Sequence, residues 1–349
     1  MASEVTVPRT PGERCHRRPG RAIAVLFRFP ALSALALLAL ACSAIAQSRP
    51  MPPQRNQTIG ETVADRPSAR YRFERFVVDS PDHARRWRIT LGVPRAAVPA
   101  SGFPAFWMLD GNAALMEFDE ALLDALAARA PQLLVFVGYD NALRVDTAAR
   151  TRDYTPIPAL RGEGAEVALA GGGADAFLDS IAQTILPELA RRVPLDRQRQ
   201  ALWGHSFGGL FTLHALYRGG GVFQTYAAAS PSLWWADGYM LGEPERRFFA
   251  EPAGGPARVL VMLGGGERNP GLDGRDLSDP RVAAHMRRVA AAPADAALRL
   301  SERLRQRPGL EVEYREFPAL AHGPMLRASL LYALHAVTGV ADRSGDAGP

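Results

Sequence analysis

A six-residue segment, Gly204-His205-Ser206-Phe207-Gly208-Gly209, has the residue types of a turn that presents a serine nucleophile. It contains the pattern G-x-S-x-G and lies between the apolar run Ala201–Trp203 and a stretch of helical periodicity over residues 208–218. A sharp strand-to-helix turn exposes the hydroxyl at the end of a sheet, where a helix N-terminus favours developing negative charge. The segment therefore predicts Ser206 as a nucleophile for acyl transfer, and a chance turn rich in Gly and Ser is the alternative.

A serine hydroxyl is a weak nucleophile and needs a base, which is usually a histidine. His322 lies in a short loop between the last predicted strand and the last predicted helix, where its ring could reach back toward Ser206. His205 is expected to point away from the Ser206 hydroxyl, and it is a candidate substrate contact. The other histidines beyond residue 46 precede a strand or fall in predicted helices: His83, His214, His285 and His335. His322 is therefore the predicted base.

The base is normally held by a carboxylate, and in this type of fold the chain order is serine, acid, histidine. Glu267 follows the apolar run 259–263 and occupies the expected position for the acid. Asp273 and Asp276 lie a few residues further on and are the alternatives. Each of the three could instead be a solvated loop acid.

Two backbone N–H groups are expected to stabilise the oxyanion of the reaction. One belongs to Phe207, the residue after the predicted nucleophile, and the second usually comes from a loop after an earlier central strand. Here that loop follows residues 105–109, so the N–H of Gly111 or Asn112 is the candidate. The same residues could also form a simple helix cap, and the two interpretations are compatible.

The elements that must position these residues follow an alternating order of strands and helices. Residues 72–78 and 86–93 alternate between polar and apolar side chains, as half-buried antiparallel strands do. Short solid apolar runs at 105–109, 133–137, 200–203, 226–229 and 259–263 predict strands buried on both faces, and residues 311–317 alternate like an edge strand. Helical periodicity covers residues 113–129, 174–192, 208–218, 281–305 and 325–338. This order predicts an α/β fold with a mostly parallel sheet, antiparallel N-terminal strands and helices on both faces.

The start of the chain has the pattern of a secretory leader. A charged segment up to Arg28 precedes a small and aliphatic run, 31–46, which ends in Ala44-Ile45-Ala46. We therefore expect a signal peptide at 1–46, a flexible tether at 47–67, one catalytic domain at 68–340 and a tail at 341–349. These features predict a periplasmic or secreted protein, with an uncleaved inner-membrane anchor or a lipidated Cys42 as alternatives.

Composition excludes several other classes of function. All 41 basic residues are arginine, and six of them lie in the first 46 residues together with two of the 36 acidic residues. The rest of the chain thus has a net charge of +1, which does not favour nucleic-acid binding. Both cysteines, Cys15 and Cys42, lie in the leader, so the remaining chain has neither a disulfide nor a thiolate metal site. We expect no metal and no organic cofactor.

Five motifs in order resemble the putative-esterase branch of the α/β-hydrolases. They are Met108–Asn112, Arg150–Pro156, Gly204–Gly209, Ser230–Trp235 and Ala321–Gly323. The resemblance spans residues 71–338 and is greatest to the periplasmic trilactone esterases of enterobactin and salmochelin siderophores. It implies the α/β-hydrolase fold and an esterase, with Ser206 and His322 as nucleophile and base. The resemblance implies a Ser–His dyad, as in the siderophore enzymes. This chain nevertheless has Glu267 at the position of a third triad member, so both a dyad and a triad are open.

The resemblance also implies substrate-binding residues. Arg150 would meet the substrate, although an ion pair that holds its loop is the alternative. Trp234 and Trp235 could line an aromatic pocket that suits catechol rings, and core packing of one or both is the alternative. Residues 161–173 and 269–280 are places where substrate preference could depart from the family.

The function expected from these residues is two-step acyl transfer on a small ester, with an acyl-enzyme intermediate. Its substrate would be a catecholate siderophore lactone. A general carboxylesterase, or an esterase like S-formylglutathione hydrolase, has the same machinery and is the first alternative. A catalytically silent α/β-hydrolase that only binds a ligand is the second.

Overall fold

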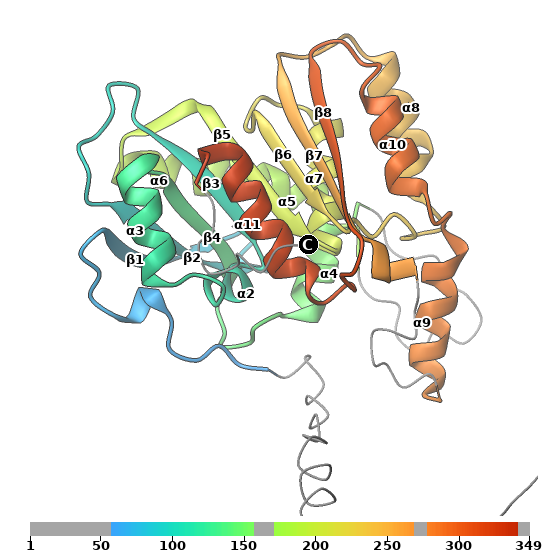
Figure 1. Cartoon of the computed structure of the whole chain (residues 1–349), viewed down its shortest axis with the longest axis horizontal. Helices are drawn as coiled ribbons and strands as arrows, with labels where there is room; N and C mark the ends of the chain where they lie inside the picture. Colours follow the sequence, from blue (N-terminus) through green and yellow to red (C-terminus); the bar gives the residue numbers. More distant parts are fainter. Residues whose placement is uncertain (1–56, 157–170, 269–277, 341–349) are drawn as a thin grey trace, which may run out of the picture. The chain divides into compact units, whose positions relative to one another are not determined.

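The computed structural model describes residues 57–156, 171–268 and 278–340 (Figure 1). The predicted leader, residues 47–56 of the predicted tether and the C-terminal tail lie outside these ranges. Among the described residues, none of the helices is long and apolar enough to cross a membrane.

An eight-stranded sheet with the strand order β1-β2-β4-β3-β5-β6-β7-β8 forms the middle of the fold. The pairs β1–β2 and β2–β4 are antiparallel, and every other neighbouring pair is parallel. The strands are β1 (Tyr71–Asp79), β2 (Arg86–Pro94), β3 (Phe103–Leu109), β4 (Leu133–Tyr139), β5 (Leu195–His205), β6 (Thr225–Ala229), β7 (Ala257–Gly264) and β8 (Leu310–Phe317). The predicted fold class, a mostly parallel sheet with antiparallel N-terminal strands, is confirmed.

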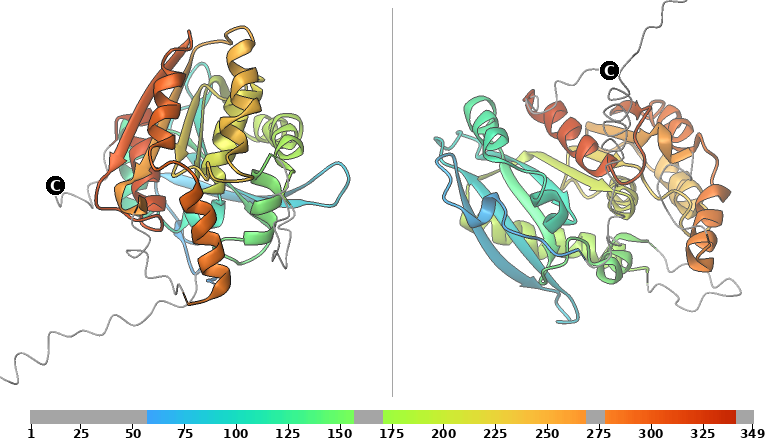
Figure 2. Two further views of the ribbon diagram at one scale, coloured as in Figure 1. Left: turned by 90° about the vertical axis from the view of Figure 1, so that its right-hand side faces the viewer. Right: turned by 60° about the horizontal axis from the view of Figure 1, so that its bottom comes forward.

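Helices cover both faces of this sheet (Figure 2). Alternate residues of β3 divide between two cores, because successive side chains of a strand point to opposite faces: Trp107 and Leu109 join one core, and Phe106 and Met108 join the other. The first core includes residues of α5 (Ala174–Ser180), α6 (Leu186–Arg192), α7 (Phe207–Arg218), α8 (Glu243–Ala250) and α10 (Ala296–Leu304). The second includes residues of α2 (Gly111–Leu115), α3 (Glu120–Arg129) and α11 (Met325–Thr338).

The described helices differ from the predicted ones in three ways. The segment 113–129, predicted as one helix, divides between α2 and α3. The segment 281–305, also predicted as one helix, divides between α9 (Pro280–Ala291) and α10. A π-helical segment, Ile181–Ile185, separates α5 from α6. Two helices, α4 (Thr147–Tyr154) and α8, were not predicted at all. Three short 3-10 helices, Val63–Asp65, Tyr239–Leu241 and Gly265–Arg268, complete the described elements.

The parallel strands bring the candidate site residues to one edge of the sheet. Ser206 follows β5, the loop with Gly111 follows β3, and Glu267 and His322 follow β7 and β8. Carboxyl ends of parallel strands lie on the same side, so these four loops share that edge.

Candidate active site

The turn at Ser206 is strained and tightly packed. Ser206 has φ 63° and ψ −116°, a backbone conformation that non-glycine residues rarely adopt. A Cβ at Gly204 would lie 2.3 Å from the carbonyl oxygen of Gly208, and a Cβ at Gly209 would lie 2.5 Å from the carbonyl oxygen of Ala229. Gly204 and Gly209 therefore cannot carry a side chain. Gly208 differs, because the nearest atom to its Cβ would be 3.5 Å away, an ordinary contact.

The contacts of His322 are those of an oriented imidazole. Its Nδ1 lies 2.7 Å from Oε2 of Glu267, and its side chain is 27% exposed. The other oxygen of Glu267, Oε1, accepts hydrogen bonds from the Ser230 hydroxyl and from the backbone N–H of Gly264, at 2.5 and 2.9 Å. The two alternative acids, Asp273 and Asp276, lie outside the described residues.

Burial and hydrogen bonding act in opposite directions on Glu267. Burial alone would raise the pKa of its carboxyl, but the hydrogen bond and charge of His322, with the hydrogen bonds from Ser230 and Gly264, hold the pKa below its ordinary value. The group is therefore a carboxylate at neutral pH, and it can fix the tautomer and the orientation of the His322 ring.

His205 is part of the turn, and its ring packs against that of His322. It precedes Ser206 in the chain, and its ring centroid is 4.6 Å from that of His322. Burial, followed by charge interactions with His322 and Arg150, lowers the pKa of His205 well below its ordinary value, so its ring is neutral. His205 is only 7% exposed, and its ring packs against that of His322; a contact with substrate stays a prediction.

The loop after β3 has a constrained backbone that packs tightly against β4. Asp110 has a left-handed backbone, with φ 50° and ψ 49°, and a Cβ at Gly111 would lie 2.7 Å from the backbone of Phe136. Phe207 and Gly111 are the first residues of α7 and α2, and the first N–H groups of a helix have no partner within it. The N–H groups of Phe207 and of Gly111 or Asn112 therefore lie in the first turns of α7 and α2, and their role as oxyanion donors stays a prediction.

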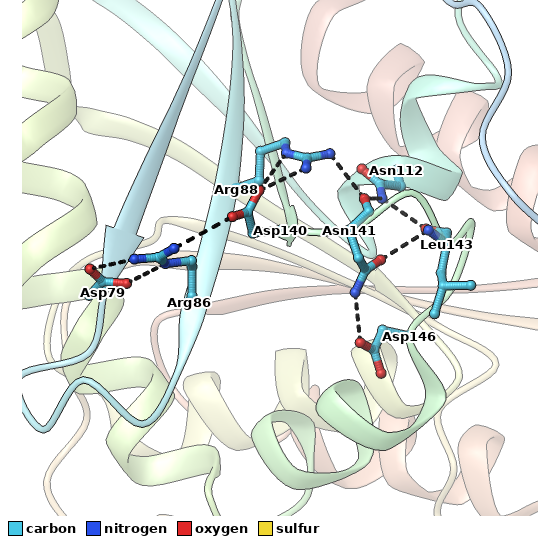
Figure 3. A network of polar contacts seen from close by, with 8 residues as sticks. All are labelled: Asp79, Arg86, Arg88, Asn112, Asp140, Asn141, Leu143 and Asp146. Carbon is cyan, nitrogen blue, oxygen red and sulfur yellow. Dashed lines mark hydrogen bonds and ion pairs between the residues drawn. The ribbon is translucent and has the colours of Figure 1, made fainter.

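The side chain of Asn112 holds this loop from the other direction (Figure 3). Its amide Nδ2 donates to the carbonyl oxygens of Asn141 and Leu143, at 3.1 and 2.8 Å. The Asn141 amide in turn donates to Asp146, and the second carboxylate oxygen of Asp146 caps α4 at the N–H of Ala149. Asn112 can therefore offer an oxyanion only its backbone N–H, since its side-chain amide is engaged.

Arg150 is buried in α4 beneath the turn. Its Nε and Nη2 contact both carboxylate oxygens of Asp110 at 2.9–3.1 Å, and Nη2 also donates to the carbonyl oxygen of His205 at 3.0 Å. These contacts match the alternative of an ion pair that holds its loop, and a contact between Arg150 and substrate stays a prediction.

The two tryptophans of the Ser230–Trp235 motif have different environments. Trp235 is 2% exposed and packs edge-on against Phe207, with ring centroids 5.0 Å apart, so it follows the core-packing alternative. Trp234 is partly exposed and lies between Phe207 and His285 of α9, at 5.8 and 5.1 Å. Of the two, the partly exposed Trp234 is the better placed for an aromatic substrate contact, and that contact stays a prediction.

Two serines near Ser206 were not singled out as site residues from the sequence. Ser232 Oγ lies 3.4 Å from Ser206 Oγ, and its backbone N–H donates to the Ser206 carbonyl oxygen at 3.2 Å. Ser230 adopts a positive φ of 42° and holds Glu267. Their position directly after β6, the neighbour of β5, is the signal that could have found them.

Known proteins resemble this chain over most of its length. The model of the family described as "Putative esterase" matches residues 80–284. The chain belongs to this esterase family. The apo-salmochelin esterase of Escherichia coli O6:H1 is 32% identical over 87% of this chain and 90% of that protein. The ferri-bacillibactin esterase BesA of Bacillus subtilis is 28% identical over 74% of this chain and 88% of that protein.

Solved structures of the family agree with the fold. The enterobactin hydrolase IroE in complex with DFP has a TM-score of 0.58 at 30% identity, over 79% of this chain and 99% of IroE. The fold of the described residues is thus that of the α/β-hydrolase esterases, and the resemblance inferred from the five motifs is confirmed.

Proposed function

We propose that this chain is an exported serine esterase that hydrolyses the ester bonds of a siderophore lactone. Family membership supports esterase chemistry, and the names of the related enzymes, an apo-salmochelin esterase and a ferri-bacillibactin esterase, support a siderophore as substrate. The contact between His322 Nδ1 and Glu267 at 2.7 Å carries the mechanistic part. It leaves Nε2 of His322 as the nitrogen that can accept a proton from Ser206.

The proposed reaction proceeds in two balanced halves. Ser206 Oγ attacks the ester carbonyl carbon while His322 Nε2 takes the hydroxyl proton, and the carbonyl oxygen becomes an oxyanion held by backbone N–H groups. The carbon–oxygen bond to the leaving alcohol then breaks, and His322 returns the proton to that alcohol. Water then attacks the acyl carbon while His322 takes one of its protons. The bond between that carbon and Ser206 Oγ breaks, and His322 returns the proton to Oγ, which releases the acid and restores the Ser206 hydroxyl.

Glu267 and the strained turn make this chemistry possible at neutral pH. The Glu267 carboxylate stabilises the imidazolium that forms when His322 takes the proton. The strained backbone of Ser206 presents the hydroxyl beside the start of α7, and the N–H of Phe207 supplies one oxyanion donor. Gly111 or Asn112 supplies the second.

Covalent labelling tests this proposal directly. The protein comprising residues 47–349 is treated with a fluorophosphonate, and intact-protein and peptide mass spectra locate the adduct. We expect one adduct on Ser206, no adduct in Ser206→Ala, and strongly slowed labelling in His322→Ala. Absence of labelling in the folded wild-type protein would instead favour a silent binding module.

Competition against that labelling tests the substrate class. A cyclic tri-catecholate trilactone, iron-free or ferric, is expected to slow labelling at concentrations at which a simple aryl acetate has no effect. Equal protection by both compounds would favour a general carboxylesterase. Export is tested separately, by expressing the full chain and determining the N-terminus of the periplasmic or secreted product, which we expect to be Gln47.

A further inference from the structure

Ser232 has a buried hydroxyl that the proposed mechanism leaves without a role. The residue is 3% exposed, and its Oγ lies 3.4 Å from Ser206 Oγ. Within the part of the chain that the structure describes, this contact is the only hydrogen bond of the Ser232 side chain. Buried hydroxyls are usually hydrogen-bonded to the backbone or to water, whereas this one meets the proposed nucleophile.

The backbone, rather than the hydroxyl, holds Ser232 in this position. Its N–H donates to the carbonyl oxygen of Ser206 at 3.2 Å, and its carbonyl oxygen accepts from the N–H of Trp235 at 3.0 Å. Two residues earlier, the N–H of Ser230 donates to the carbonyl oxygen of Met262 on β7 at 2.7 Å. None of these bonds involves the Ser232 side chain, so the hydroxyl can be removed without releasing the loop.

The direction of this contact depends on the chemical state of Ser206. In the free enzyme either hydroxyl can be the donor, and 3.4 Å is long compared with about 2.7–2.8 Å for a typical hydrogen bond between hydroxyls. In the proposed acyl-enzyme, Ser206 Oγ is an ester oxygen without a proton, so it can only accept. Ser232 must then be the donor.

We propose that Ser232 is a catalytic residue of the deacylation half of the reaction. Its hydroxyl donates to Oγ of the acylated Ser206, draws electron density from the ester and makes the acyl carbon more open to attack by water. When the bond between that carbon and Oγ breaks, negative charge develops on Oγ and the hydrogen bond to it strengthens. His322 delivers the proton to Oγ, and Ser232 keeps its own. This inference rests on the proposed serine-esterase function.

The same hydrogen bond does not help acylation. A donor beside Ser206 Oγ withdraws electron density from the nucleophile, which offsets the stabilisation of the charge that develops there during attack. Only an interaction that is stronger in the transition state than in the ground state accelerates a step. Removal of the Ser232 hydroxyl should therefore slow deacylation and leave acylation almost unchanged.

Ser232→Ala tests this division between the two halves. The acyl-enzyme is formed with an activated aryl ester, and intact-protein mass spectra follow its formation and its decay in wild type and variant. We expect the rate constant of decay to fall about tenfold, the size of one hydrogen bond to an oxygen with partial charge. Fluorophosphonate labelling of Ser206 should stay within about threefold of wild type. In steady state, kcat and KM for the aryl ester should fall together, so that kcat/KM is unchanged.

Other serine variants separate catalysis from stability. Ser329 of α11 is a fully buried serine whose Oγ accepts from the indole N–H of Trp203 on β5 at 3.2 Å. Ser329→Ala is expected to lower the melting temperature yet keep both rate constants of wild type. Ser232→Thr keeps a hydroxyl and should recover most of the lost decay rate. If Ser232→Ala fails to fold, Ser232→Cys, whose thiol is a weaker donor of similar size, should show the same selective slowing to a smaller extent.

Two results would overturn this role of Ser232. Equal losses of labelling, kcat/KM and acyl-enzyme decay in Ser232→Ala would mean that the hydroxyl supports the turn as a whole rather than deacylation. Decay of the acyl-enzyme at the wild-type rate in the folded variant would mean that the hydroxyl has no catalytic role. Wild-type protein that does not label with the fluorophosphonate would defeat the proposed function itself, whatever the variants do.

Discussion

Replacing Glu267 with glutamine should slow ester hydrolysis about a thousand-fold or more and leave the fold intact. The reason lies in the three hydrogen bonds that Glu267 accepts. Oε1 accepts from the Ser230 hydroxyl and the Gly264 N–H, so an amide NH2 at that position would oppose a backbone donor. The glutamine NH2 must therefore face His322 Nδ1, which is 2.7 Å from Oε2.

This orientation forces the wrong tautomer on His322. An NH2 group beside Nδ1 requires Nδ1 to be an acceptor, so the ring proton moves to Nε2, which can then no longer take the proton of Ser206. In a serine-protease triad the corresponding change costs about 10⁴ in kcat. Loss of the carboxylate charge alone predicts a rate loss of similar size. A carboxylate and an imidazolium about 4 Å apart, at an effective dielectric constant of about 20, attract each other by about 4 kcal/mol, which corresponds to roughly a thousand-fold in rate.

The assay is steady-state hydrolysis of an aryl ester by Glu267→Gln, with enzyme concentration fixed by active-site titration. Glu267→Ala serves as a comparison, because it removes the charge without imposing a tautomer and should be no slower than the glutamine variant. Glu316→Gln is the matched control, since Glu316 is a partly exposed carboxylate of β8 that pairs with Arg268. We expect near-wild-type rates for the control. A hydrolysis rate of Glu267→Gln within tenfold of wild type would refute the reasoning and favour a Ser–His dyad.

Three further outcomes follow from the same contacts. Because the pKa of Glu267 is lowered in the folded protein, its carboxylate stabilises the fold above the ordinary pKa of 4.5, and this stabilisation is lost as the pH falls through the folded pKa. In urea unfolding, the difference in unfolding free energy between wild type and Glu267→Gln should therefore shrink as the pH falls below 4.5. Gly204→Ala should abolish activity or folding, whereas Gly208→Ala should retain most activity and an unchanged circular dichroism spectrum. Trp235→Ala should lower the free energy of unfolding by about 3–5 kcal/mol, while Trp234→Ala should mainly raise KM for a catecholate ester.

Much of the sheet could be predicted because its strands carry clear patterns. Each described strand overlaps a predicted one, since solid apolar runs mark buried strands and alternation marks the edges. Residues 113–129 were predicted as one helix, but the chain leaves α2 after Leu115 and begins again at Glu120, where Asp119 caps the new helix. Periodicity continues across such a break, so it does not reveal the break.

Helix α4 was not predicted because it lacks an apolar stripe. Its sequence, Thr147–Tyr154, is mostly polar, yet four of its residues are buried: Arg150, Thr151, Asp153 and Tyr154. Their burial depends on partners that are distant in sequence, such as Asp110 for Arg150 and Trp87 for Asp153. Local pattern cannot show that a polar residue has a buried partner.

The candidate site was predictable in its positions but less so in its contacts. Ser206, Glu267 and His322 could be chosen because each follows a strand at the same edge of the sheet. The packing of His205 on His322, and the different burial of Trp234 and Trp235, depend on how the loops fold over that edge. The catalytic roles of all these residues remain predictions.

Chromatography of a cyclic tri-catecholate trilactone, incubated with residues 47–349 or with Ser206→Ala, is the most direct test of the proposed esterase. Iron-free and ferric forms are compared, because the related enzymes are named for an apo and a ferric siderophore. We expect linear trimer, dimer or monomer products with the wild-type protein and an intact ring with the variant. An intact trilactone beside rapid cleavage of a simple aryl ester would contradict a siderophore substrate, and equal cleavage by Ser206→Ala would contradict Ser206 as the nucleophile.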